Sequence, residues 1–186
     1  MIGRSKVTIT ELTLGGLKLI QPQVFKDERG FFIESYNQER YAEFGISEVF
    51  VQDNHSLSSQ GSLRGMHFQS FPGQGKLIRV IQGTIFDAVV DIRPGSSTFG
   101  EWAGVELDAE SHQQLWIPNG FAHVFCVLSE TAEVLYKVTS LYNPTTEKGF
   151  AWNDPDIGIE WPVENPMLSD RDKSAPPFSE FKSSLS

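Results

Sequence analysis

The chain has 186 residues, a formal net charge of −9, 39% hydrophobic residues and 12% aromatic residues. That length suits one domain, and we expect residues 1–186 to form a single unit with an N-terminal arm and a C-terminal tail wrapped around it. The acidic charge excludes a general nucleic-acid binder, which needs a broad basic face. No apolar run is long enough to span a membrane. Cys126 is the one cysteine, so no intrachain disulfide is possible and a reducing cytoplasm is the expected location.

In chain order, the one strongly predicted helix covers QERYAEF, with Asn37 as its cap and Gly45 as its terminator. The strands predicted before Asn37 form a separate arm, and because such arms often exchange between subunits we expect a homodimer. The tail over 162–177 contains several prolines and is predicted to be extended. Between the helix and the tail, short runs typical of strands cover 49–53, 76–83, 84–93, 102–108, 112–118, 122–129 and 132–142. The spacing of these runs predicts a mainly β sandwich or barrel with short peripheral helices.

Four of these runs place a polar residue on an otherwise apolar strand face. The residues are Lys76, Asp87, His123 and Tyr136. Lys76 shares its strand face with Ile78 and Val80, and each of the other three has an apolar residue two positions away on both sides. Taken singly, an inward His or Tyr is more often a core group with a backbone partner, and Lys76 at a strand end can reach water. Because an unpaired buried charge costs several kcal/mol, four such placements together indicate a polar site inside the barrel.

The densest group of polar residues lies in FVQDNHSLSSQGSLRGMHFQSFPGQGKLIRVIQG. Upstream of it stands RGFFIESYN, and downstream stand WIPNGFAHVF, EVLYKVTSLYNP, GFAWNDPDIGIEWP and LSDRD. With these motifs in this order, the chain from Val7 to Pro177 resembles the dTDP-4-dehydrorhamnose 3,5-epimerase family. The resemblance implies a cupin, or jelly-roll, β-barrel that usually forms a dimer.

Many cupins bind a metal through two His and a Glu on a first motif and a His on a second. Here the second motif survives as P-x-G-x-x-H ending at His123, but His67 is followed by Gln69 where a second His would stand. Lys76 lies near the position of the missing Glu, and its cation would repel a metal. We therefore expect neither a metal nor another cofactor.

By resemblance, the substrate is dTDP-4-dehydro-6-deoxy-D-glucose, and inversion at C3 and C5 gives dTDP-4-dehydro-L-rhamnose in dTDP-L-rhamnose biosynthesis. Both carbons flank the C4 ketone, so the reaction needs a base, a stabiliser for the enolate oxygen and an acid on the opposite face. His67 is the expected base, and the resemblance pairs it with Asp172. Lys76 is expected to hold the C4 oxygen, and Tyr136 matches the family's proton donor.

The resemblance also implies a set of residues that contact the substrate and its nucleotide. Tyr142 matches a position that stacks on thymine, and at Arg171 the commoner family residue is Lys. Asp87 is a supporting candidate that would orient Lys76 or His123. The full expected binding set is Arg29, Glu34, Gln52, Asp53, Asn54, Arg64, Lys76, His123, Tyr142, Glu147 and Arg171.

Two hydrophobic departures from relatives, Met66 and Val124, are expected to alter the shape of the pocket without removing a catalytic group. They leave open an epimerase that acts at C3 or C5 only, on a related 4-keto-6-deoxy sugar nucleotide. Other classes also remain open: a sugar-nucleotide-binding cupin without catalysis, and a metal-dependent cupin dioxygenase.

Overall fold

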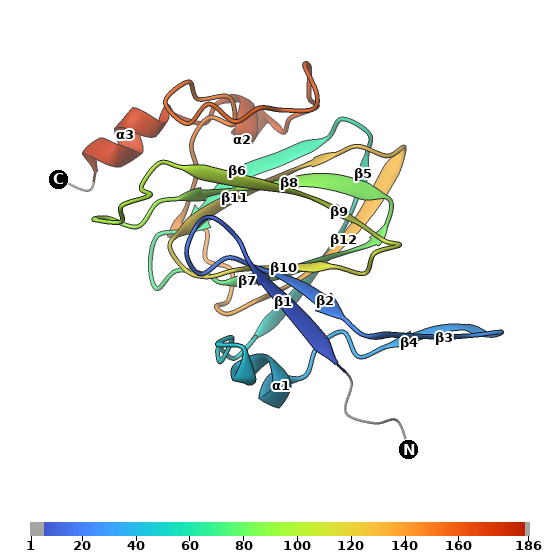
Figure 1. The fold of residues 1–186 in the computed structure, drawn as a ribbon. Helices are drawn as coiled ribbons and strands as arrows, with labels where there is room; N and C mark the ends of the chain where they lie inside the picture. The colour runs from blue at the N-terminus through green and yellow to red at the C-terminus, as the bar shows by residue number, and fades with distance from the viewer. Residues whose placement is uncertain (1–5, 185–186) are drawn as a thin grey trace.

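Two antiparallel sheets face each other and form the body of the protein, which is described over residues 6–184 by a computed structural model (Figure 1). In spatial order, the six-stranded sheet contains β1 (Val7–Glu11), β2 (Lys18–Pro22), β10 (Gln114–Ile117), β7 (Lys76–Gln82), β12 (Thr131–Val138) and β5 (Gln52–Ser59). The five-stranded sheet contains β13 (Glu147–Lys148), β6 (Leu63–Gln69), β11 (Phe121–Val127), β8 (Thr84–Asp91) and β9 (Trp102–Asp108). The expected mainly β jelly-roll architecture is confirmed.

The main hydrophobic core lies between the inner faces of the two sheets. Ile78 and Val134 come from the six-stranded sheet, while Val89, Leu107 and Phe125 come from the five-stranded sheet. Burying one such side chain stabilises the fold by about 1.5–3 kcal/mol. Because strand side chains alternate, the same inner faces also carry the four polar residues that the sequence pattern singles out.

The predicted helix is confirmed as α1 (Gln38–Glu43), which covers the outer face of the six-stranded sheet (Figure 1). The Asn37 side chain accepts a hydrogen bond from the Arg40 amide at 3.1 Å, and Gly45 follows the helix with φ +79°. Asn37 thereby satisfies one of the amides that a helix start leaves without a partner. Tyr41 is the buried residue of the helix and belongs to an outer cluster with Trp116.

The N-terminal arm has two parts. Strands β1 and β2 join the six-stranded sheet through the pairing of β2 with β10. The hairpin of β3 (Val24–Asp27) and β4 (Gly30–Ile33) extends away from the body (Figure 1). Near its tip the side chains of Phe31 and Phe32 are 59% and 54% exposed.

Three local predictions need correction. The run over 49–53 enters a strand only at Gln52, and β6 occupies 63–69, where no strand is predicted, because a bulge interrupts its alternation. The tail is not extended throughout, since α2 (Asp170–Lys173) lies within it and α3 (Phe178–Ser183) follows. Helices this short leave no clear periodic pattern in the sequence. Within residues 6–184, no helix is long and apolar enough to cross a membrane.

Candidate active site

A cavity of about 710 Å³ opens between the two sheets, within the size range of small-molecule sites. Its wall includes strands from both sheets, the loop after β12 and the start of α2. The predicted site residues that line it are Gln52, Asn54, Arg64, His67, Lys76, His123, Tyr136, Tyr142, Glu147, Arg171 and Asp172.

A β-bulge on β6 brings two polar side chains to the same face. Opposite Val124 of β11, β6 has two residues, Gly65 and Met66. Arg64 and His67 are three positions apart, so a regular strand would point them to opposite faces; the extra residue turns both toward the cavity. Gly65 has φ +137°, and a Cβ there would lie 2.5 Å from Val124 Cβ, so the bulge requires glycine.

The two hydrophobic departures lie on the other face of this sheet. Met66 and Val124 are buried in an outer cluster with Phe68 and Phe150. Neither belongs to the cavity wall. The expectation that they alter the pocket directly is therefore not supported by their positions, because their side chains point away from it.

His67 and Asp172 form a close pair at the cavity, although 105 residues separate them in sequence. His67 Nε2 lies 2.7 Å from Asp172 Oδ1, and Ser169 Oγ donates to Asp172 Oδ2 at 2.8 Å. Burial opposes ionisation of the Asp172 carboxyl, but the hydrogen bonds from His67 and Ser169 lower its pKa below the ordinary value. The carboxylate is thus held charged against the imidazole.

Ser169 is a site residue that the sequence analysis missed. It caps α2: its Oγ accepts a hydrogen bond from the Asp172 amide at 3.1 Å while donating to the carboxylate of the same residue. The signal in the sequence is the spacing Ser-x-x-Asp in LSDRD, which is the pattern of a capping box.

Lys76, Asp87 and His123 form a buried polar group beside this pair. Asp87 Oδ2 lies 2.9 Å from His123 Nε2, so of the two predicted partners it is His123 that the carboxylate contacts directly. Burial lowers the pKa of Lys76 to about 8, and the negative charges of Asp87 and Glu147 oppose that lowering. Burial also lowers the pKa of His123, and this lowering favours the neutral imidazole. The charge of Asp87 and its hydrogen bond oppose the lowering.

Tyr136 faces the cavity from the opposite sheet. It lies on β12 of the six-stranded sheet, whereas His67 lies on β6 of the five-stranded sheet. Burial raises the pKa of Tyr136, so the phenol keeps its proton at neutral pH. The site therefore has a His–carboxylate pair on one wall and a protonated phenol on the facing wall.

At the mouth of the cavity, hydrogen bonds connect the loop after β12 with α2. Glu147 accepts from the Tyr142 hydroxyl at 2.9 Å and from Arg171 Nη1 at 2.6 Å. Gln52 accepts from the Tyr142 amide at 3.1 Å and donates to Asn54 at 2.8 Å. The exposed Tyr142 ring and the Arg171 cation suit an aromatic base and a phosphate respectively.

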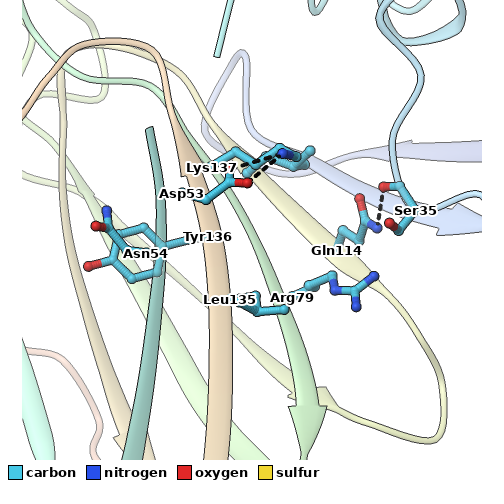
Figure 2. A pocket seen from close by; sticks show the side chains of 9 residues that line it. Ser35, Asp53, Asn54, Arg79, Gln114, Leu135, Tyr136 and Lys137 are labelled. Atoms are coloured by element: carbon cyan, nitrogen blue, oxygen red, sulfur yellow. Dashed lines mark hydrogen bonds and ion pairs between the residues drawn. The ribbon is translucent and has the colours of Figure 1, made fainter. Parts of the chain in front are cut away.

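Three predicted binding residues lie outside this cavity. Arg29 pairs with Asp27 on the β3–β4 hairpin, and Glu34 forms an ion pair next to α1. Asp53 faces a smaller pocket of about 200 Å³ on the outer side of the six-stranded sheet, where it accepts from Lys137 Nζ at 2.9 Å (Figure 2). Within one chain, the structure does not bring these three residues to the others.

The donor set at the cavity does not fit a divalent cation. Both histidine Nε2 atoms, those of His67 and His123, are already bonded to carboxylates, and the Lys76 ammonium lies beside them. Across the part of the chain that the structure describes, no three His, Cys, Asp or Glu residues are grouped closely enough to hold a metal ion. A zinc or iron site normally needs three such ligands.

Comparisons with known proteins agree with this geometry. The model of the family described as dTDP-4-dehydrorhamnose 3,5-epimerase matches residues 11–180. The enzyme of that name from Shigella flexneri is 54% identical over 162 residues, covering 86% of this chain and 90% of the relative. The one from Neisseria gonorrhoeae is 50% identical over 95% of this chain, which spans only 54% of that relative.

Among solved structures, dTDP-6-deoxy-D-glucose-3,5-epimerase from Legionella pneumophila, in complex with dTDP-4-keto-L-rhamnose, superposes with a TM-score of 0.93. It is 46% identical, and the match covers 97% of each chain. With the cavity, the fold and these similarities in agreement, the chain belongs to the dTDP-4-dehydrorhamnose 3,5-epimerase family.

Proposed function

We propose that this protein epimerises dTDP-4-dehydro-6-deoxy-D-glucose at C3 and C5 to give dTDP-4-dehydro-L-rhamnose, a step in dTDP-L-rhamnose biosynthesis. One observation carries the proposal: the His67–Asp172 pair and Tyr136 stand on facing walls of one cavity. Inversion of a carbon needs a base on one face and an acid on the other, and this arrangement supplies both.

In the first step, His67 removes the proton from C3 or C5. An imidazole suits this task near neutral pH, since its ordinary pKa lies near 6.5. The Asp172 carboxylate, 2.7 Å from Nε2, fixes the tautomer and stabilises the imidazolium that forms. Nδ1 of His67 is then the ring atom that is left to receive the proton.

The enolate that follows carries negative charge on the C4 oxygen. Lys76 is the cation on the buried wall, and a charge in a water-poor site stabilises such an oxyanion more strongly than it does in water. Tyr136 then returns a proton to the opposite face of the carbon. We assign His123 to the substrate, and Asp87, through its 2.9 Å contact, to the orientation of the His123 ring.

The nucleotide is assigned to the mouth of the cavity, with Tyr142 stacked on thymine and with Arg64 and Arg171 facing the diphosphate. Gln52, Asn54 and Glu147 complete this region.

We also propose a homodimer, supported by the hairpin that leaves the body with two exposed phenylalanines. Arg29 lies in the turn of this hairpin and Glu34 directly follows it, both outside the cavity of their own chain, so a nucleotide-binding role for them requires the cavity of a second copy. Asp53 contacts Lys137 on the outer side of its sheet and would have to turn from that pair to reach the nucleotide. A cytoplasmic location is proposed from the one buried, free cysteine.

Incubation with the 4-keto sugar nucleotide in deuterium oxide tests the proposal. We expect deuterium at both C3 and C5 and conversion to the L-sugar, followed by proton NMR. His67→Ala should abolish exchange at both carbons. His55→Ala is the matched control, because His55 is an exposed histidine that pairs with Glu133 on the outer side of the six-stranded sheet.

Each alternative predicts a different result in the same assay. Deuterium at one carbon only would identify a 3- or 5-epimerase, and no deuterium at either would identify a sugar-nucleotide-binding protein without catalysis. Loss of activity in EDTA, with recovery on adding a metal, would identify a metal-dependent enzyme. Robust exchange by His67→Ala would refute the assignment of the base.

A further inference from the structure

We propose that Asp154 is a positioning residue for the catalytic base, acting through the C-terminal segment that carries Asp172. This inference rests on the proposed function, because it concerns the base of that reaction. We call residues 167–178 the strap. It includes α2 and passes over the outer side of the five-stranded sheet, next to β6 (Figure 1).

The strap starts at a backbone pairing. The Met167 amide donates to the Gly61 carbonyl at 2.8 Å, and the Leu63 amide donates to the Met167 carbonyl at 2.9 Å. These bonds attach the start of the strap to the beginning of β6, the strand that carries His67. These bonds fix where the strap begins, but they do not hold its far end.

Asp154 holds the far end. Its Oδ2 accepts a hydrogen bond from the Phe178 amide at 2.8 Å, and the neighbouring Ala151 amide donates to the Pro176 carbonyl at 2.8 Å. Asp154 is only 6% exposed, and its second oxygen accepts from the Asp156 amide at 3.0 Å. One buried carboxylate therefore bridges its own turn and the end of the strap.

Aromatic packing surrounds this contact. The Phe178 ring lies 4.9 Å from that of Phe150 and 5.6 Å from that of Phe99, measured between centroids. Phe181 of α3 lies 5.0 Å from Phe68, which follows His67 in sequence but faces the outer layer. The end of the strap is thus packed on the outer side of the strand that presents the base to the cavity.

The strap needs both attachments because α2 has only four residues. A helix this short does not form on its own, so its position depends on its attachments, which are those at the two ends of the strap and the ion pair of Arg171 with Glu147. Asp172 is the buried residue of α2 and reaches His67 from it. Burying the carboxylate of Asp154 costs free energy of folding that an apolar residue at this position would not cost. Its position at the end of the strap indicates that it sets the distance between Asp172 and His67.

Asp154→Asn tests this inference, since the amide keeps the size of the side chain but can accept through only one of its two terminal atoms. We expect kcat to fall about 10–100-fold with KM within about twofold, because a carboxylate displaced on the order of 1 Å no longer orients the base. Asp156→Asn is the matched control, because Asp156 is exposed in the same turn and contacts Asp154 through its backbone amide, which the substitution keeps.

A double-mutant cycle separates positioning from a general effect on folding. In an Asp172→Asn background, Asp154→Asn should change kcat by less than about twofold, because the group on which it acts is gone. If the losses of kcat in Asp154→Asn and Asp172→Asn multiply in the double variant, the inference is overturned. A folded Asp154→Asn variant with the kcat of the wild type would also overturn it. Circular dichroism and a thermal melt establish folding, and Asp154→Ser is the second variant if the amide does not accumulate as folded protein.

Amide hydrogen exchange of peptides covering 165–176 supplies a readout without substrate. We expect faster exchange in Asp154→Asn than in Asp156→Asn or the wild type. Unchanged exchange would overturn the role of Asp154 even if the wild type were active. A wild type that incorporates no deuterium into the sugar would instead refute the proposed function, and the strap would then be judged by exchange alone.

Discussion

Lys76 gives the sharpest test of the chemistry, because its charge should be lost at an accessible pH. Burial lowers the pKa of this residue from 10.5 to about 8, against the opposing charges of Asp87 and Glu147. That lowering corresponds to roughly 3 kcal/mol in favour of the neutral amine. Below pH 8 the ammonium is present to meet the enolate oxygen. Above it, the charged fraction falls about tenfold for each pH unit, and the rate should follow.

The assay is deuterium incorporation at C3 and C5 between pH 6 and 10, corrected for exchange without enzyme. We expect kcat/KM to fall above about pH 8, while kcat falls at a higher pH because the bound substrate favours the cation. Lys76→Met should lower kcat by about 100–1000-fold and remove this alkaline limb. Lys182→Met, at an exposed position on α3, is the matched control. A kcat/KM of the wild type that stays constant up to pH 10 would refute the role of Lys76.

Three further predictions concern the acid, the bulge and a buried carboxylate. Tyr136→Phe removes the proton donor but leaves the base, so NMR should show exchange persisting while inverted product falls by about 100-fold or more; equal losses of both would contradict this. Gly65→Ala should lower the melting temperature by roughly 5 °C, whereas Gly15→Ala, which has open space for the added methyl, should not. Asp91 is fully buried against Arg93, so Asp91→Asn should lower the free energy of unfolding by about 3 kcal/mol at pH 7. Burial opposes ionisation of Asp91, but hydrogen bonds led by that from Arg93 lower its pKa. In denaturant titrations, the difference in unfolding free energy between Asp91→Asn and the wild type should therefore shrink below about pH 4, where the carboxylate of the unfolded chain becomes protonated. A difference that stays constant with pH would argue against the ion pair.

Strand alternation was enough to predict which polar side chains face inward. Lys76, Asp87 and His123 are all at least nine-tenths buried, and Tyr136 packs against the same inner core. The period of two is a property of any regular strand, so this prediction needs no knowledge of the partner strands. The Asn37 cap succeeded for a similar reason, since a cap depends on residues next to it in sequence.

Features that depend on distant or irregular contacts could not be predicted in this way. Strand β6 was missed because its bulge breaks the alternation between Arg64 and His67. The pairing of His67 with Asp172 came from family resemblance, since no local pattern connects residues 105 positions apart. The position of Arg29 on a projecting hairpin depends on tertiary structure and is not visible in its motif.

The strap also has a consequence for the order in which the protein is made. Strands β1 to β12 all precede residue 139, whereas Asp172 lies in α2, beyond them in the chain. Because folding can begin during synthesis, a growing chain can pair the barrel strands before the carboxylate for His67 has left the ribosome. Strands β1 to β12 can therefore pair before the base has its partner, and a C-terminal truncation just before Phe178, which keeps every strand, should give a folded barrel with an incompletely assembled site.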